Sequence, residues 1–386
     1  MAGPLSGVRV LDLTHVLNGP FCTMVLAHLG AEVLKVEYGP GDRFRHSWMA
    51  PSAKRDGYEF LMVNSNKKGI TLNLKHEKGR HIFRQLVDKS DVVTENFTVG
   101  VMDRLGFGYD ALCEINPRII YACSRGYGED GPYAHVRANA GTIMAMSGWQ
   151  YAAQEQAGVP GVKAMGIGDE AAGISLALAI CAALYEREQS GKGQKIEVAM
   201  QEALMGFMAS TFHTHFEGRK VGAAPKEAAD GNYSFHLPDV TDDLWIKLSA
   251  AMGKPELAED ERYATVKGRR QHYEELEELV SEWVRGKTRL ELWKVLSGFG
   301  LSSGMVLSLG EAIEDPHIKA RGAFVDVEHP EAGTLKLLAP WMRFSETPAK
   351  ITSPAPLIGQ HNREVYGDLL GLSEAEIDKL AEEGAI

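Results

Sequence analysis

Short apolar runs alternate with amphipathic segments through the first half of the chain, and this alternation restricts the fold more than any other feature. The run VRVLDL (8–13) is mostly apolar, as a strand buried on both faces is, and EVLKVE (32–37) and IIYACSR (119–125) are predicted as further strands. Between the first two runs, Pro20 begins a helical pattern that stops at Gly30. This rhythm predicts an α/β protein with a parallel, doubly wound sheet.

The same rhythm continues to about residue 200. The further predicted elements are strands at 70–74, 91–97 and 194–200 and helices at 77–90 and 170–189.

The composition and the predicted elements change in the second half of the sequence, which indicates a division of the chain into domains. Residues 1–215 are expected to form a large domain, and the Gly/Ala-rich, polar stretch 216–234 to form a linker. Charged amphipathic helices and a few strands predict a smaller α+β domain at 235–335. Residues 336–386 begin with a proline-containing linker and end in a helix that Ser373 is expected to cap.

Charge and composition exclude several classes of function. The chain has 41 Lys and Arg against 52 Asp and Glu, a net charge of −11, which disfavours binding to nucleic acid or to an anionic membrane surface. The longest apolar stretch, 174–185, is too short to span a bilayer, and the N-terminal residues show no signal-peptide pattern. Four cysteines without a CxxC pair suggest reduced thiols in a cytoplasmic protein.

Asp169 is the strongest candidate for chemistry. It stands where a loop of small residues enters a long apolar helix, between Gly168 and the helix interior. One interpretation is a capping aspartate whose oxygen accepts backbone N–H groups. The other is a nucleophile, because Gly166 and Gly168 leave room for a ligand and the N–H groups of a helix start can stabilise an oxyanion.

Three further sequence patterns give weaker evidence for a catalytic or binding site. GLSSG (300–304) matches the nucleophile elbow GxSxG, but it follows a predicted helix and precedes a predicted strand, the reverse of the required context. His213 and His215 would share one face of a strand, yet no CxxC or HExxH pattern accompanies them, so no metal site is predicted. The dinucleotide fingerprint GxGxxG is absent after the first strand, where THVLNGP (14–20) stands, which disfavours an ordinary NAD protein.

Several cations occur where open α/β sheets bind ligands, in loops and at helix starts. They are Lys67, Lys68, Lys75, Arg104 and Arg137. Each alone is typical of a solvated surface, and together they allow a phosphorylated small ligand.

The motifs taken together resemble the class III CoA-transferases, the family of formyl-CoA:oxalate and carnitine CoA-transferases and of acyl-CoA racemases. The resemblance covers nearly the whole chain in the expected order. The segments that carry it are 11–37, 94–97, 102–110, 116–133, 168–170, 191–204, 314–324 and 356–366.

This resemblance implies a Rossmann-like large domain, completed by the C-terminal segment that returns to it, and an interlocked dimer. It implies that Asp169 attacks an acyl-CoA thioester and passes through an aspartyl anhydride and an aspartyl-CoA thioester. Coenzyme A or acyl-CoA would be a substrate, with no tightly bound cofactor. The residues that would contact CoA by motif position are His15, Val16, Leu72, Lys75, Asn96, Phe97, Arg104 and Arg137.

The sequence also departs from the family's patterns. Family racemases carry a His at the position of Asn139, and an amide cannot exchange the α-proton. The formyl-CoA:oxalate enzymes carry a Gln at the position of Leu17 and a Tyr at that of Asn139. Trp48 is retained, whereas the Gly-rich lid is missing and 232–245 looks shortened.

The predicted substrate pocket comprises Leu17, Trp48 and Asn139, and the side chains of Leu17 and Trp48 are more apolar than oxalate requires. Met146 and Trp149 would add to that character. A larger or more apolar acyl group is expected.

The sequence thus predicts a CoA-transferase that moves CoA from an acyl-CoA to a small carboxylic acid. The alternatives are an acyl-CoA racemase or epimerase, which Asn139 disfavours, and a non-catalytic CoA-binding subunit of a heteromer, which the presence of Asp169 disfavours. A homodimer is expected, with a heteromer of related subunits left open.

Overall fold

A computed structural model describes residues 3–46, 56–158, 161, 163–218, 225–235 and 241–386. These divide into two compact units, each with a core of its own. The first comprises Met1–Gln154, Gly161–His213 and Ala320–Ile386, and the second Glu155–Pro160 and Thr214–Lys319.

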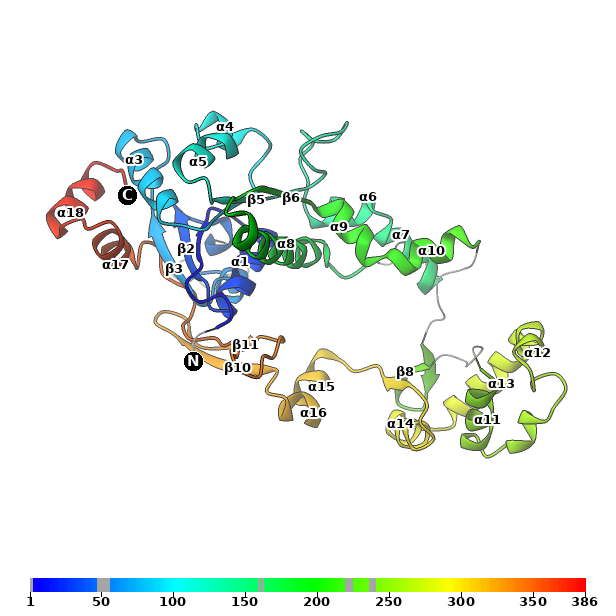
Figure 1. Cartoon of the computed structure of the whole chain (residues 1–386). Helices are drawn as coiled ribbons and strands as arrows, with labels where there is room; N and C mark the ends of the chain where they lie inside the picture. The colour runs from blue at the N-terminus through cyan, green and yellow to red at the C-terminus, as the bar shows by residue number, and fades with distance from the viewer. Residues whose placement is uncertain (1–2, 47–55, 159–160, 162, 219–224, 236–240) are drawn as a thin grey trace. The chain divides into compact units, whose positions relative to one another are not determined.

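A parallel six-stranded sheet forms the centre of the first unit (Figure 1). Its strands are β1 (Arg9–Asp12), β2 (Glu32–Glu37), β3 (Lys67–Thr71), β4 (Val92–Glu95), β5 (Ile120–Arg125) and β6 (Lys195–Ala199). Their order in the sheet is β3-β2-β1-β4-β5-β6, with every neighbouring pair parallel. This is the strand order of a Rossmann fold, and the predicted α/β fold class is confirmed.

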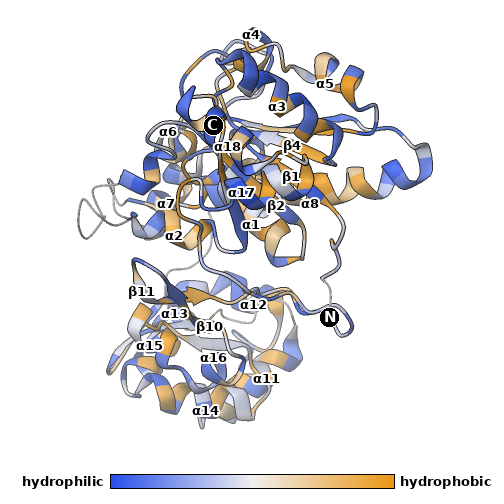
Figure 2. Ribbon diagram, turned by 90° about the vertical axis from the view of Figure 1, so that its left-hand side faces the viewer, coloured by the Kyte–Doolittle hydropathy of each residue, from blue (hydrophilic) through white to orange (hydrophobic). Residues whose placement is uncertain are grey.

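Helices cover both faces of the sheet because its strands are apolar on both sides. On one face, α1 (Asn18–His28) and α8 (Gly168–Ser190) pack over side chains such as Val10 and Ile120. On the other, α3 (Glu77–Asp88), α5 (Tyr109–Ile115) and the C-terminal residues pack over Leu11. Figure 2 shows the apolar residues gathered on β1, β4 and the helices beside them.

The C-terminal segment contributes to the second of these faces. Tyr366 is fully buried in that core and donates its hydroxyl to the backbone oxygen of Thr71, 2.6 Å away. Ala385 accepts a hydrogen bond from the N–H of Asn73 at 2.9 Å. The last residues of the chain therefore pack into the core of the first unit.

The remaining elements of the first unit are shorter. They are η1 (Arg43–His46), α2 (Tyr58–Val63), α4 (Val101–Arg104), α6 (Ala140–Met146), α7 (Trp149–Ala157), α9 (Met200–Phe207), α10 (Ala209–Phe216), β10 (Phe324–His329), β11 (Gly333–Leu338), α17 (Asn362–Glu364), the π-helical turn η3 (Val365–Leu369) and α18 (Glu374–Glu382). Helices α7 and α10 continue a few residues into the second unit.

The second unit packs helices against a small antiparallel sheet in the order β7-β8-β9. Its strands are β7 (Lys226–Ala228), β8 (Gly231–Phe235) and β9 (Ser303–Met305), and its helices are α11 (Asp242–Ala251), η2 (Pro255–Ala258), α12 (Val266–Gln271), α13 (Tyr273–Arg285), α14 (Arg289–Gly298), α15 (Leu309–Glu314) and α16 (Pro316–Ala320). Tyr233 and Trp245 are fully buried in its core.

Two segments differ from their expected roles. Strand β7 and all of β8 but its last residue lie inside 216–234, the stretch expected to be a linker, because alternate residues such as Tyr233 are buried there. The β10–β11 hairpin, expected in the small domain up to residue 335, groups with the first unit. It does so because Leu335 packs with Phe60 and Leu61.

Helix α8 is a core helix with an apolar outer side. Over the residues that the structure describes, it is the one helix long and apolar enough to cross a membrane, although the uninterrupted apolar stretch in the sequence is short. Half of its apolar window is buried inside the protein, which is common for core helices.

Candidate active site

Loops that follow the strands gather at the carboxyl edge of the sheet. The strand order reverses between β1 and β4. The loops after these two strands therefore turn toward opposite sides of the sheet, which leaves room for a ligand between them. Helices α1 and α8 both run back from this edge toward the start of the next strand. Their first turns therefore lie at the same edge as the loops.

The loop after β1 and the loop after β4 are joined by Asn96. The N–H of His15 donates to Asn96 Oδ1 at 2.8 Å, and Asn96 Nδ2 donates to the backbone oxygen of His15 at 2.8 Å and to Asn18 Oδ1 at 2.9 Å. Beside this contact, the rings of His15 and Phe97 lie with their centroids 5.7 Å apart. Three predicted CoA contacts, His15, Asn96 and Phe97, are thus neighbours in the structure.

The amide of Asn96 has little capacity left for a ligand. Both hydrogens of its Nδ2 are used by His15 and Asn18, and its oxygen already accepts one hydrogen bond. In this arrangement the Asn96 side chain holds the backbone of His15 and the side chain of Asn18.

Val16 has an unusual backbone. Its φ is +71°, in the left-handed region that a β-branched residue rarely adopts. Its N–H donates to the buried carboxylate of Asp42, 3.1 Å from Oδ1. Burial, together with the positive charge of Lys35, lowers the pKa of His15, so that its ring is neutral at pH 7.

A buried ionic group fixes the backbone of Phe97. The carboxylate of Glu95 accepts hydrogen bonds from the Phe97 N–H at 2.7 Å, from Arg125 Nη1 at 2.9 Å and from the Tyr121 hydroxyl at 2.7 Å. Burial and the Glu95 charge raise the pKa of Tyr121, which keeps its hydroxyl protonated as a donor. The charged residues at the ends of β4 and β5 were the only sign of this group in the sequence.

The predicted cations separate into two classes. Lys75, Arg104 and Arg137 are exposed, and within the described part of the chain none of them has an ion-pair partner. Leu72, predicted beside Lys75, is buried after β3. The three exposed side chains remain available for phosphate oxygens.

Lys67 and Lys68 are not available, which corrects the grouping made from the sequence. Both lie in β3. Lys67 is buried, with its Nζ 3.0 Å from Asp12 Oδ2, and Lys68 pairs with Glu32 and Glu364 at 2.7 Å each. Their partners come from other strands and from the C-terminal segment, which local sequence cannot show.

Asp169 lies in the first turn of α8 without capping it. The N-cap of α8 is Ile167, and the capping interpretation of Asp169 is wrong. Among the residues that the structure describes, the Asp169 carboxylate has no hydrogen-bond or ion-pair partner. Burial, and to a smaller degree the charge of Glu170, raises the pKa of Asp169 to about 6. At pH 7 the ionised form of the Asp169 carboxyl group still predominates.

Gly173 brings the Asp169 face of α8 against the start of α1. Residues 169 and 173 are four apart and share a helix face. A Cβ at Gly173 would lie 2.6 Å from the backbone oxygen of Asn18 and 3.0 Å from the ring of Phe21. Only glycine allows this approach, which places Asp169 at the end of α1 that the His15–Leu17 loop enters.

The predicted substrate-pocket residues are partly placed. Leu17 is the N-cap residue of α1 and packs at the edge of the α1–α8 core. Asn139 caps α6, with its Oδ1 3.1 Å from the N–H of Thr142, and the following Ala140 lies against Gly168 at the start of α8. Trp48 lies outside the described residues.

Met146 and Trp149 differ in exposure. Met146 is exposed, whereas Trp149 packs near Ile167 at the start of α8. The indole N–H of Trp149 is buried and, over the described residues, finds no hydrogen-bond acceptor.

The other sequence patterns do not form sites. His213 and His215 lie in the helix α10, not in a strand, and residues two apart on a helix do not face each other. In the part of the chain that is described, no group of three or more potential ligands could hold a metal. In the GLSSG motif, the serine at the nucleophile position, Ser302, is exposed and directly precedes β9. Its neighbour Ser303 lies in β9, with its hydroxyl 2.7 Å from that of Tyr233.

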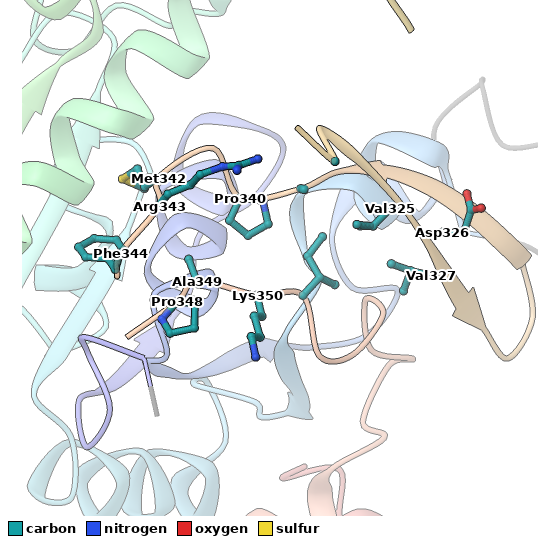
Figure 3. Close-up of a pocket in the computed structure, with 13 residues that line it drawn as sticks. Val325, Asp326, Val327, Pro340, Met342, Arg343, Phe344, Pro348, Ala349 and Lys350 are labelled. Atoms are coloured by element: carbon teal, nitrogen blue, oxygen red, sulfur yellow. The ribbon is translucent and has the colours of Figure 1, made fainter. Parts of the chain in front are cut away.

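A separate cavity of about 600 Å³ lies between the β10–β11 hairpin and residues 339–351 (Figure 3). Val325 and Val327 of the hairpin line one side, and Met342 and Phe344 lie toward the other. None of the candidate site residues lines this cavity.

Known proteins match this chain over its whole length. The CoA-transferase family III model matches residues 5–362. The formyl-CoA:oxalate CoA-transferase of Streptomyces coelicolor is 37% identical over 411 aligned positions, covering 100% of both chains. The succinyl-CoA–D-citramalate CoA-transferase of Chloroflexus aurantiacus is 34% identical and covers 98% of this chain and 96% of its own.

Solved structures agree with the fold. Rv3272 from Mycobacterium tuberculosis superposes with a TM-score of 0.84 at 31% identity, covering 94% of this chain and 98% of that one. A CAIB/BAIF family protein from Brucella suis gives 0.80 at 30% identity, covering 96% and 100%. The chain described here belongs to CoA-transferase family III and is a CoA-transferase that acts on CoA thioesters and carboxylates.

Proposed function

We propose that this enzyme transfers CoA from an acyl-CoA to a small carboxylic acid with Asp169 as the covalent carrier. The observation that carries the proposal is the state of Asp169: an ionised carboxylate, half-buried at a helix start, with no partner among the described residues. Most buried carboxylates are paired, and one left unpaired beside a ligand-binding edge is suited to act on a ligand.

The first half-reaction loads CoA onto the protein. An oxygen of Asp169 attacks the thioester carbon, the C–S bond breaks, and CoA leaves as a thiolate. The thiolate then attacks the Asp169 carbonyl of the anhydride, the C–O bond breaks, and the donor acid leaves as a carboxylate. The product is an aspartyl-CoA thioester, which conserves the energy of the original thioester.

The second half-reaction returns CoA to the acceptor. The acceptor carboxylate attacks the aspartyl thioester and displaces the CoA thiolate. The thiolate attacks the acceptor's carbonyl in the mixed anhydride, which forms the new acyl-CoA and restores the Asp169 carboxylate. Water must be kept from both intermediates, because an anhydride hydrolyses.

Binding of the CoA moiety is assigned to the loops at the sheet edge. Phe97 offers an apolar face to the adenine, and the exposed cations Lys75, Arg104 and Arg137 are free to meet phosphate oxygens. His15 and Val16 supply the backbone of the loop that leads into α1, and Leu72 is buried three residues before Lys75.

The acyl pocket favours a group larger or more apolar than oxalate. Leu17 stands where the formyl-CoA:oxalate enzymes carry a glutamine, and Trp149 packs at the start of α8. The unpartnered indole N–H of Trp149 can donate to an oxygen of the acyl group or the acceptor acid. The side chain of Asn139 caps α6, and its amide cannot act as an acid or base toward the α-carbon of a substrate. This disfavours racemisation.

We propose that two copies of the chain associate through the outer side of α8. Leu178 and Tyr185, seven residues apart on that side, are 71% and 72% exposed, and Phe207 of α9 is 55% exposed. Large apolar side chains grouped on one face are unusual for a monomer. Light scattering should give the mass of a dimer for the native chain and of a monomer for Leu178→Glu.

Isotope exchange tests the transfer itself. The purified chain should move label from a free carboxylic acid into its CoA thioester, with ping-pong kinetics in which each substrate alone supports its half-reaction. Deuterium entering the α-carbon without an acceptor acid would instead identify a racemase. No exchange by the single chain, with exchange restored by a related subunit, would identify half of a heteromer.

A further inference from the structure

The conformation of the loop between β1 and α1 is held by one buried carboxylate. Val16 is left-handed, and a β-branched side chain disfavours that conformation. Strain of this kind persists only where the surroundings over-determine it, and it concentrates at ligand-binding sites.

The carboxylate of Asp42 accepts the hydrogen bond that holds Val16 in this conformation. Its side chain is fully buried, and its Oδ1 and Oδ2 lie 3.1 and 3.2 Å from the Val16 nitrogen. Oδ1 also accepts the N–H of Phe44 at 3.0 Å, and Oδ2 lies 3.9 Å from His15 Nδ1. One carboxylate therefore touches two successive residues of the loop next to Asp169.

Lys35 on β2 anchors the carboxylate from below. Its Nζ is fully buried, lies 3.0 Å from Asp42 Oδ2 and also donates to the backbone oxygen of Thr14. The ion pair thus ties the sheet to the loop at two points. A buried charge pair with this many backbone contacts is suited to specify one conformation.

We propose that Asp42 is a positioning residue for CoA binding: it holds Val16 left-handed and so keeps the His15–Leu17 loop in the conformation that receives the thioester end of acyl-CoA. This inference rests on the proposed function, because that function gives the loop its ligand. Asp42 itself does not meet the substrate. Its effect is on the fraction of molecules whose loop is ready to bind, which scales the apparent affinity directly.

The test is a double-variant cycle read by equilibrium binding of free CoA, with calorimetry on the full chain. Asp42→Ala removes the acceptor and should weaken CoA binding at least tenfold and raise the KM for acyl-CoA more than it lowers kcat. Asp42→Asn, which keeps an acceptor for the Val16 N–H but loses the charge, should lie between. Because glycine adopts positive φ readily, adding Val16→Gly to Asp42→Ala should recover at least threefold of the lost affinity.

Asp91→Asn is the matched control. Asp91 pairs with the largely buried Arg187 at 2.9 Å and accepts the N–H of Arg9 at 2.8 Å, at the amino edge of the sheet. It should lower the melting temperature as the Asp42 variants do and leave CoA affinity unchanged. The inference would be overturned if folded Asp42→Ala bound CoA as tightly as the native chain, or if adding Val16→Gly restored no CoA affinity. In either case, turnover by the native chain would still support the proposed function. Absence of CoA binding by the native chain would overturn both.

Discussion

Replacing Asp169 by asparagine should make the free protein more stable at neutral pH while it abolishes transfer. The raised pKa means that the folded state disfavours the charged carboxylate. Asparagine has nearly the same shape and no charge, so the cost of burying the charge disappears. A catalytic carboxylate that is costly to the fold is a mark of a functional site.

The magnitude follows from the difference between the two pKa values. The ordinary value for an aspartate is 3.8 and the folded value about 6, a difference worth at most about 3 kcal/mol of unfolding free energy. Between these values the native state binds more protons than the unfolded state, so stability falls as pH rises through the window. The destabilisation is absent below about pH 4 and fully present above about pH 6.

Denaturant unfolding of both proteins from pH 4 to pH 8 measures this. Asp169→Asn should be the more stable protein at pH 7 to 8, by up to about 3 kcal/mol, and the difference should shrink toward zero at pH 4. Glu170→Gln serves as a control that removes only the neighbouring charge. It should slightly reduce the rise in the Asp169 pKa and thus the pH range over which stability changes. An Asn variant less stable than the native chain, or a difference that does not change with pH, would refute the reasoning.

Three further predictions concern the frame of the site. Gly173→Ala should destabilise the fold by about 1–3 kcal/mol in thermal unfolding, since its Cβ would meet the Asn18 backbone at 2.6 Å, and an unchanged melting temperature would contradict that contact. Arg104→Ala should weaken CoA binding measured by calorimetry, more at low salt than at high salt, without changing stability. Lys68→Ala, whose side chain is paired with two glutamates, should leave CoA affinity as it was, and a loss as large as that of Arg104→Ala would show that the cations were sorted wrongly.

The sheet was predictable because its strands are apolar on both faces. The mostly apolar run at 8–13 and the strand pattern at 32–37 are visible in the sequence, and the six strands pair in the order that a doubly wound fold requires. The strands at 226–235 were not visible, because only three or four alternating positions mark them. The His213–His215 segment shows the same ambiguity, since a short run with apolar residues fits a helix or a strand.

The candidate nucleophile could be predicted from the sequence, but the buried residues and backbone geometry around the site could not. Asp169 stands out because glycines precede it and an apolar helix follows. Whether it caps the helix depends on backbone geometry that residue order does not fix. Lys67 looked like a surface cation, while its partner Asp12 lies 55 positions away, on another strand. Asp42 and Glu95 were missed for the same reason.

The covalent role of Asp169 is the central claim, and peptide mass spectrometry tests it most directly. The chain would be incubated with a panel of acyl-CoAs, quenched in acid and digested. The proposed chemistry requires an added mass equal to CoA less one water, on the peptide that carries Asp169, and its absence in Asp169→Ala. Turnover by the native chain without that adduct, or undiminished turnover by the variant, would contradict the claim.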